Sequence, residues 1–290
     1  MTVPRLLIVA GSDSGGGAGI QADIKTATAF GVYAMTAITA VTVQNTLGVQ
    51  GWHPVPPETV RGQIEACLSD IGADAIKTGM LGDAAMVETV AAALKQSRAP
   101  LVVDPVMVAK GGAKLLADAA VEAIRARRLP LGLLVTPNLP ECEALIGFAP
   151  TTDDEARRAA ASFRALGVRH VLFKGGHAFD HPLRPSLARE PATGTSPTSA
   201  LRMGEEGAIV RDYLVDGETG ELLVLEAPRI ATRHTHGTGC TLASAIASGL
   251  ALGLPLADAV GRAHAYVQQA IRTAPGLGKG HGPLNHFVKP

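Results

Sequence analysis

This sequence of 290 residues has no excess of positive or negative charge, few aromatic side chains and few cysteines. Lysine plus arginine and aspartate plus glutamate number 26 each, so the formal net charge is zero, and no general field attracts nucleic acid or an anionic membrane. A local anion site is still compatible with this balance. Aromatic residues make up 3% and apolar residues 47%, which predicts a sizeable core of Ala, Val, Leu and Ile.

Long apolar runs are also missing. The N-terminal stretch MTVPRLLIVAGSDSGGG has a five-residue apolar run before its first glycine, which is shorter than a signal peptide or a membrane span requires. No later run is long enough, so we expect no membrane contact. The three cysteines, Cys67, Cys142 and Cys240, are too few and too scattered for a disulfide framework, which favours a reducing cytoplasm.

Short apolar runs alternate with helical patterns along the chain. Strands are predicted at 5–11, 35–44, 73–79, 100–106, 131–138 and 169–176, helices at 20–31, 56–72, 83–97, 153–167, 240–253 and 256–273, and a hairpin at 213–227 with its turn at Asp216–Gly220. The alternation predicts a doubly wound α/β fold, in which helices cover both faces of a mainly parallel sheet. We expect residues 1–290 to form a single domain.

Residues 181–207 interrupt this alternation. They are rich in Pro, Ser, Thr and Arg and lack a sustained apolar period, which predicts a flexible surface insertion. A loop without a role is the favoured interpretation, and a lid over the substrate is the alternative.

The first glycine-rich segment, AGSDSGGGAG at 10–19, lies where a strand gives way to a helix, so its backbone can approach a ligand closely. However, no register gives G-x-G-x-x-G, and Ile24 stands where a P-loop needs its second glycine. A tight turn between strand and helix explains this segment as well as a ligand-binding loop does.

The second glycine-rich segment, HTHGTGC at 234–240, opens a helix of small residues. Gly237 and Gly239 can adopt backbone angles closed to other residues, and the unpartnered N–H groups and dipole of the helix terminus favour a phosphate there. Cys240 at this terminus is expected to have a lowered pKa. An inert buried thiol is the alternative, and the preceding glycines argue against it.

Polar residues follow several predicted strands, at the sheet edge where ligands bind in such folds. Asp104, Asn138 and Lys174 hold these positions. Asp104 and Glu141 could place Mg²⁺ beside phosphates, although each alone is no better than a surface carboxylate. Lys174 is either a phosphate clamp or a solvated lysine.

Further polar residues surround the two glycine-rich segments. Gln44 closes a strand, where its amide offers a donor and an acceptor to a heterocycle. Asp23 either lies beside the first glycine loop or faces solvent. His234 and His236 lack further zinc ligands at a suitable spacing, so we interpret them as loop histidines with at most a ligand contact.

Eight segments occur together in order: AGSDSGGGAGIQADIKT, TAVTVQNTLGV, IKTGMLGD, VVDPVMVAKGG, TPNLPE, FKGGH, HTHGTGCTLASAIA and GKGHGPLNH. This combination closely resembles the hydroxymethylpyrimidine/phosphomethylpyrimidine kinases of the ribokinase-like superfamily, over nearly the whole chain apart from the insertion. The resemblance implies the doubly wound α/β fold, a homodimer, and successive transfer of two phosphoryl groups from ATP, with Mg²⁺, to a small pyrimidine alcohol in thiamin biosynthesis.

The resemblance also implies roles for individual residues. Gln44 should hydrogen-bond the aminopyrimidine, and its pocket should be lined by Asp23, Gly11, Thr42, Met80 and Val106. Gly237, Gly239 and Cys240 should donate N–H groups to the migrating phosphoryl, with Cys240 as the base for the attacking hydroxyl. The nucleotide should lie near Lys174, Asn138 and Thr238, and Mg²⁺ near Asp104 and Glu141.

Two other functions compete with this one. A pyridoxal kinase, or a kinase with both specificities, is the nearest alternative, because relatives with the same GTGC turn phosphorylate that ring. Some of those kinases carry a second cysteine in a lid where this chain has Ala109, which weakens the alternative. A catalytically inactive ligand sensor is the other candidate, and Cys240, the glycines and Lys174 argue against it.

Overall fold

The computed structural model describes residues 3–107, 118–175 and 209–290. The predicted insertion at 181–207 and Ala109 lie outside the described residues. Within them, the strands form one sheet in the order β3-β2-β1-β4-β5-β6-β7-β8-β9. The strands are β1 (Arg5–Ser12), β2 (Tyr33–Asn45), β3 (Gly48–Pro54), β4 (Ala75–Thr78), β5 (Leu101–Val103), β6 (Leu134–Val135), β7 (His170–Phe173), β8 (Ile209–Asp216) and β9 (Leu222–Pro228).

The middle of the sheet is parallel and both of its edges are antiparallel. Strands β2 to β7 pair in parallel through β1, β4, β5 and β6, as crossover helices require. At one edge β3 pairs antiparallel with β2, and at the other β8 and β9 form the predicted hairpin that turns at Asp216–Gly220. The doubly wound α/β prediction is therefore confirmed. Strand β3 was not predicted, because it carries Gly51, His53 and Pro54 in place of an apolar alternation.

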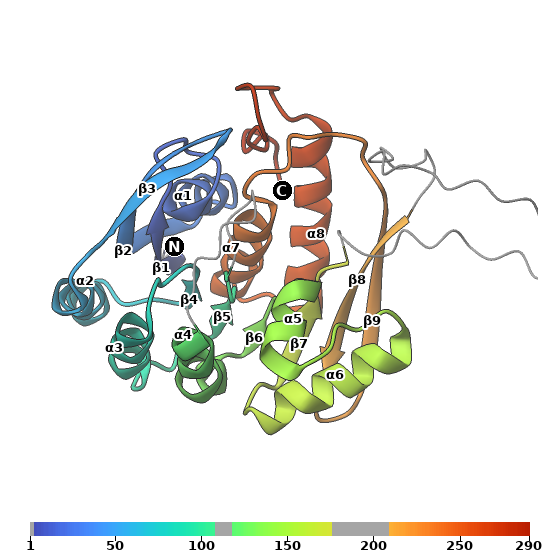
Figure 1. The fold of residues 1–290 in the computed structure, drawn as a ribbon, viewed down its shortest axis with the longest axis horizontal. Coiled ribbons are helices and arrows are strands. Elements are labelled where there is room, and N and C mark those ends of the chain that lie inside the picture. The colour runs from blue at the N-terminus through green and yellow to red at the C-terminus, as the bar shows by residue number, and fades with distance from the viewer. Residues whose placement is uncertain (1–2, 108–117, 176–208) are drawn as a thin grey trace, which may run out of the picture.

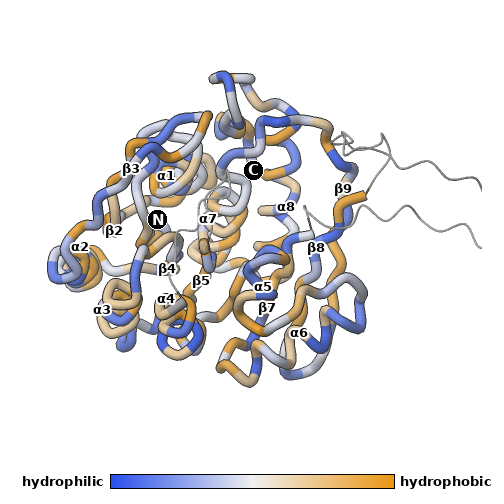
Figure 2. The backbone as a smooth tube through the Cα atoms, in the orientation of Figure 1, coloured by the Kyte–Doolittle hydropathy of each residue, from blue (hydrophilic) through white to orange (hydrophobic). Residues whose placement is uncertain are grey.

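Helices cover both faces of the sheet (Figure 1). They are α1 (Gly19–Ala29), α2 (Pro57–Asp70), α3 (Ala84–Leu94), α4 (Asp118–Ala123), α5 (Leu139–Ile146), α6 (Asp153–Ala165), α7 (Thr238–Ala251) and α8 (Leu256–Arg272). One apolar layer packs α2 to α6 against the sheet, and the other packs α1, α7 and α8. Figure 2 shows hydrophobic residues along the central strands between these layers. No helix among the described residues is long and apolar enough to cross a membrane.

Strand β2 is longer than its neighbour β1, and this difference shapes the site. The β1–β2 register ends at Val41, so Thr42 to Asn45 pair only with β3. Strands β2 and β3 therefore continue together beyond the carboxyl end of β1 as a two-stranded ribbon, the β2–β3 ribbon. This ribbon adds a wall beside the loops that follow the parallel strands, which is where ligands bind in doubly wound sheets.

Candidate active site

A cavity of about 950 Å³ lies at the carboxyl edge of the parallel strands. The described residues that line it come from both glycine loops, the β2–β3 ribbon, strand β4, the loops after β4 to β7, and helices α4 and α5. The cavity brings together all but one of the residues predicted for the site, namely Gly11, Thr42, Gln44, Met80, Asp104, Val106, Asn138, Glu141, Lys174, Gly237, Thr238, Gly239 and Cys240. It is large enough for a drug-sized ligand.

The residues expected around the heterocycle gather at the first glycine loop. Thr42 donates its hydroxyl hydrogen to the carbonyl of Ser12 at 2.8 Å, which ties the ribbon to this loop. A Cβ on Gly11 would lie 2.7 Å from the Met80 methyl carbon, so glycine lets Met80 pack against the backbone. Trp52 on β3 lines the same cavity and was not predicted.

The N-terminus of α7 forms an adjoining part of the wall. Gly237 precedes the helix in the left-handed conformation (φ 83°), and no side chain caps the first turn. A Cβ on Gly237 would overlap the carbonyl oxygen of Gly17, so the two glycine loops touch through their backbones. The N–H groups of this first turn have no partner within the helix, and with the helix dipole they provide a binding site for a phosphoryl group.

Lys174 follows β7 and is the centre of a cluster of charges. Its Nζ lies 3.0 Å from Asp104 Oδ1 and 3.8 Å from Glu141 Oε2. Burial would lower the pKa of Lys174, but these carboxylates raise it above its ordinary value. The side chain is 15% exposed, so Lys174 is not a solvated lysine. A Cβ on Gly239 would come within 3.3 Å of Nζ, and the bare glycine therefore leaves room in front of the ammonium.

Glu141 and Asn138 are held by the start of α5. Asn138 Oδ1 accepts the N–H of Glu141 at 2.9 Å, and Glu141 Oε2 accepts the N–H of Asn138 at 2.8 Å. This capping box is worth about 1 kcal/mol to a helix and fixes both side chains. Burial raises the pKa of Glu141 to about 7, against the attraction of Lys174. Both carboxylates of the cluster are buried and neither lies on the surface.

The carboxylates of Asp104 and Glu141 fit a magnesium ion that is carried in with a nucleotide. Both offer oxygen donors, which Mg²⁺ prefers, and both lie within 4 Å of the same ammonium. Mg²⁺ usually retains water and uses one or two carboxylates plus substrate phosphates. Groups of three or more His, Cys, Asp or Glu arranged for a metal are absent from the described residues.

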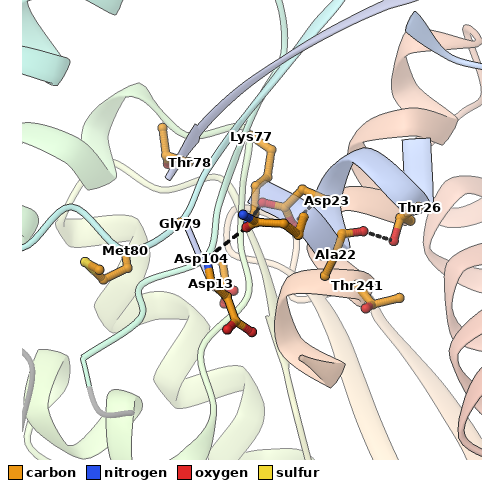
Figure 3. A network of polar contacts seen from close by, with 12 residues as sticks. Asp13, Ala22, Asp23, Thr26, Lys77, Thr78, Gly79, Met80, Asp104 and Thr241 are labelled. Atoms are coloured by element: carbon orange, nitrogen blue, oxygen red, sulfur yellow. Dashed lines mark hydrogen bonds and ion pairs between the residues drawn. The ribbon is translucent and has the colours of Figure 1, made fainter. Parts of the chain in front are cut away.

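Asp23 is the one predicted site residue that does not line the cavity. It is fully buried behind Lys77, whose Nζ lies 2.8 Å from Asp23 Oδ2, and Ser244 donates to Asp23 Oδ1 at 2.7 Å. Figure 3 shows Lys77 pointing toward Asp23, close to Asp104. Asp23 therefore neither faces solvent nor borders the space for a substrate. It holds Lys77, which does line the cavity.

Lys77 was not predicted as a site residue, although a lysine inside the apolar strand ADAIKTG is an available signal. Burial would lower its pKa, but the carboxylates of Asp23 and Asp104 raise it above its ordinary value. A charged group with no exposed surface is costly unless it is paired. Lys77 is thus a fixed positive charge beside the thiol of Cys240.

The structure contradicts the predicted low pKa of Cys240. Burial raises the pKa of its thiol to about 11, although Lys77 acts in the opposite direction. The helix terminus favours the thiolate, but removal of water and the nearby carboxylates of Asp23 and Asp104 disfavour it more strongly. The thiol is therefore neutral near pH 7 in this state of the protein.

Arg128 is a second buried cation that the sequence did not reveal. It ends the π-helical turn Ile124–Arg128 that follows α4. Its guanidinium donates to Thr78 Oγ1 and to the carbonyls of Gly79 and Asp104, all between 2.8 and 3.0 Å. Burial lowers the pKa of Arg128 to about 10. The side chain ties the carboxyl ends of β4 and β5 together and thereby positions Asp104.

His236 lies at the contact between the glycine loops. It is 8% exposed, and its Nε2 lies 2.9 Å from Asp13 Oδ2 and 3.1 Å from the side-chain amide of Gln44. His236 is a loop histidine, as predicted, and it makes two contacts within the protein that the sequence did not indicate. His234 takes no part in this contact, and its Nδ1 is buried without a hydrogen-bond partner among the residues that the structure describes.

Comparison with known proteins gives consistent results. The family model described as phosphomethylpyrimidine kinase matches residues 13–285. The hydroxymethylpyrimidine/phosphomethylpyrimidine kinase of Streptomyces coelicolor is 47% identical over 286 residues, which are 99% of this chain and 95% of the relative. The thiamine biosynthesis bifunctional protein ThiED of Geobacter sulfurreducens is 47% identical over 98% of this chain, which spans about half (52%) of that longer protein. The solved ADP complex of Bacillus subtilis pyridoxal kinase superposes with a TM-score of 0.82, 34% identity and 98% coverage of both chains.

Proposed function

The chain belongs to the phosphomethylpyrimidine kinase family, and on that premise we propose its reaction. It transfers the γ-phosphoryl group of ATP to the hydroxymethyl group of 4-amino-5-hydroxymethyl-2-methylpyrimidine. It then transfers a second phosphoryl group to the monophosphate, as a step of thiamin biosynthesis. One observation carries this proposal: Gln44, the α7 N-terminus and the Lys174 cluster line the same cavity.

Each part of the cavity has a separate task in this reaction. Gln44 on the ribbon hydrogen-bonds the aminopyrimidine, and Gly11, Thr42, Met80 and Val106 enclose it. Lys174, Asn138 and Thr238 hold the nucleotide phosphates. Phosphoryl transfer depends mainly on positioning and on stabilising charge as it develops, so the N–H groups of Gly237, Gly239 and Cys240 bind the migrating group.

Cys240 is the proton acceptor for the attacking hydroxyl in this proposal. Because the pKa of its thiol is about 11, only a small fraction is thiolate at neutral pH, and that fraction is supported by the ammonium of Lys77. A magnesium ion held by Asp104 and Glu141 would neutralise charge on the ATP phosphates. Lys174 contributes positive charge at the same place without any change in its protonation.

The reaction is tested by mass spectrometry of the products formed from the pyrimidine alcohol and from pyridoxal, each with Mg-ATP. We expect a monophosphate and then a diphosphate from the pyrimidine. The variant Gln44→Leu should weaken pyrimidine binding by about tenfold or more, because polar groups of the bound pyrimidine lose their hydrogen-bond partner. It should leave ATP binding nearly unchanged in calorimetry. Failure of the wild type to phosphorylate the pyrimidine would refute the proposal.

Pyridoxal kinase activity is the second candidate function. It is favoured by the close superposition of the chain on a pyridoxal kinase bound to ADP. The position of Ala109, where some such kinases carry a lid cysteine, lies outside the described residues. Phosphorylation of pyridoxal at a rate comparable to that of the pyrimidine would establish both specificities.

A homodimer in the cytoplasm completes the proposal. Its support in the structure is the exposed apolar surface of the β2–β3 ribbon, where Val41, Val43 and Leu47 are 51–69% exposed. All three cysteines are free thiols, as a reducing compartment requires. Light scattering of the purified chain would give the oligomeric state directly.

A further inference from the structure

Three segments that are distant in the sequence meet through one nitrogen atom. Nε2 of His236 lies 2.9 Å from Asp13 Oδ2 in the first glycine loop and 3.1 Å from the amide of Gln44 on the ribbon. The side chains of Asp13 and His236 are 3% and 11% exposed. The position of the hydrogen atom on this nitrogen therefore bears on what Gln44 presents to the cavity.

Asp13 is an ionised carboxylate in this contact. Oδ1 accepts the N–H of Gly15 at 2.8 Å, and Oδ2 accepts the N–H groups of Gly17 and Ala18 at 3.1 and 2.8 Å. Burial would raise the pKa of Asp13, but the hydrogen bond from His236 and those from the backbone hold it below its ordinary value. An ionised carboxylate only accepts hydrogen bonds, so Nε2 of His236 carries the hydrogen.

The hydrogen on Nε2 determines which end of the Gln44 amide faces His236. An N–H cannot accept a hydrogen bond from the NH₂ group, and the oxygen and nitrogen of a glutamine amide have nearly the same shape and are assigned from their partners. The carbonyl oxygen therefore faces Nε2, and the N–H is shared between this oxygen and Asp13. The NH₂ group is left pointing away from His236, and Gln44 lines the cavity together with His236.

We propose that His236 is a positioning residue for substrate specificity, which fixes the Gln44 amide so that its NH₂ group donates to an unprotonated ring nitrogen of the substrate. This proposal rests on the proposed function, because it concerns how the same site reads its heterocycle. A heterocycle with C–H in place of that nitrogen loses the hydrogen bond and leaves a buried donor unsatisfied. His236 touches Gln44 and does not need to touch the substrate.

The packing around His236 agrees with a fixed orientation. A Cβ on Gly17 would lie 2.6 Å from Cδ2 of the imidazole ring, so the ring is in contact with the backbone of the first loop. The N–H of His236 donates to the carbonyl of Gly282 at 3.1 Å, which attaches its backbone to the C-terminal segment. The ring therefore has little freedom to turn and release the amide.

The experiment compares three substrates in steady-state kinetics: the pyrimidine alcohol and two pyridine analogues, each with one ring nitrogen replaced by C–H. We expect the wild type to show a KM at least about tenfold higher for one of the two analogues, as loss of a buried hydrogen bond implies. His236→Phe should raise the KM for the pyrimidine by a similar factor without a matching rise in the KM for ATP. In this variant the KM values for the three substrates should be about equal.

Two further variants keep the result interpretable. His236→Gln places an amide N–H near the position of Nε2 and should recover part of the discrimination. His170→Phe is the matched control, since His170 also faces a carboxylate, Asp216, at 3.5 Å, but at the amino end of β7, away from the cavity; it should behave as wild type.

The outcomes separate this proposal from the proposed function. A wild type that phosphorylates the pyrimidine but does not discriminate between the three substrates would overturn the proposed orientation of Gln44 and leave the proposed function intact. A His236→Phe variant that loses turnover and keeps full discrimination would show that His236 acts only on the fold of the loop. If no phosphorylated pyrimidine forms with the wild type, the proposed function itself fails.

Discussion

Replacing Cys240 with alanine tests whether its thiol accepts the proton of the attacking hydroxyl. The substitution removes Sγ and leaves every N–H group of the α7 N-terminus in place, so both substrates should still bind and a residual rate should persist. General bases typically contribute about 10²–10⁴-fold to a rate. We therefore expect the single-turnover rate of Cys240→Ala to fall by a factor in that range.

The pKa of Cys240 gives the expected pH dependence. A value of about 11 leaves roughly one thiol in 10³–10⁴ ionised at pH 7.5, and this fraction grows tenfold with each pH unit. The wild-type rate should therefore rise steeply between pH 7 and 9, with a slope that approaches one on logarithmic axes. The alanine variant lacks the thiol, so its rate should be flat above about pH 8, where Glu141, with a pKa of about 7, is already ionised.

The assay is rapid-quench phosphorylation of the pyrimidine alcohol by excess enzyme and Mg-ATP from pH 6.5 to 9. Alkylation by iodoacetamide, followed by mass spectrometry, measures the pKa of Cys240 independently. Cys142 is an internal comparison, because burial raises the pKa of that thiol to about 12. Cys240→Asp should restore part of the rate if the position needs only a proton acceptor, although its charge also repels the phosphoryl group.

Two results would refute this reasoning. An alanine variant within about threefold of the wild-type rate would fall far short of a general-base effect, and catalysis would then depend on the glycines and the helix terminus. A pH slope that survives in the alanine variant would assign the titration to another group.

The structure makes three further predictions. Gly237→Ala should destabilise the fold more than the control Gly253→Ala in thermal unfolding. Both glycines have φ near +83°, but only at Gly237 does a Cβ meet backbone atoms. Gly253→Ala should cost about 1–2 kcal/mol, and an equal loss in both variants would contradict the close approach of the glycine loops. Burial lowers the pKa of His286 to about 4, so between pH 7 and 5 the unfolded chain binds a proton that the folded protein excludes. The free energy of unfolding should therefore fall by about 2 kcal/mol from pH 7 to 5. His286→Gln should remove this loss in urea unfolding, and an unchanged pH dependence in the variant would refute the role of His286. Lys77→Met leaves the Asp23 carboxylate buried without its cation and should lower the free energy of unfolding by about 3–5 kcal/mol. Adding Asp23→Leu should recover most of that loss. A double variant no more stable than Lys77→Met would show that the buried Lys77–Asp23 ion pair does not account for the loss.

Much of the fold could be predicted from local sequence. The apolar runs that became β1, β4, β5 and β7 are short and bounded by polar or glycine residues, and the alternation with helical periods predicts crossover connections and a parallel sheet. Local pattern also placed Asp104, Asn138 and Lys174 at strand ends. Strand β3 escaped prediction because its pairing with the extended part of β2, rather than any apolar alternation of its own, makes it a strand.

The distribution of charge and hydrogen bonds around the cavity, by contrast, depends on the tertiary structure. The glycines of HTHGTGC indicate a helix terminus that binds an anion, but the pKa of Cys240 depends on burial and on Lys77, Asp23 and Asp104, which arrive from other strands and helices. Likewise, His236 is an ordinary loop histidine until folding places Asp13 and Gln44 on the same nitrogen. Propensity and periodicity are local properties, whereas desolvation and pairing are sums over neighbours that are distant in sequence.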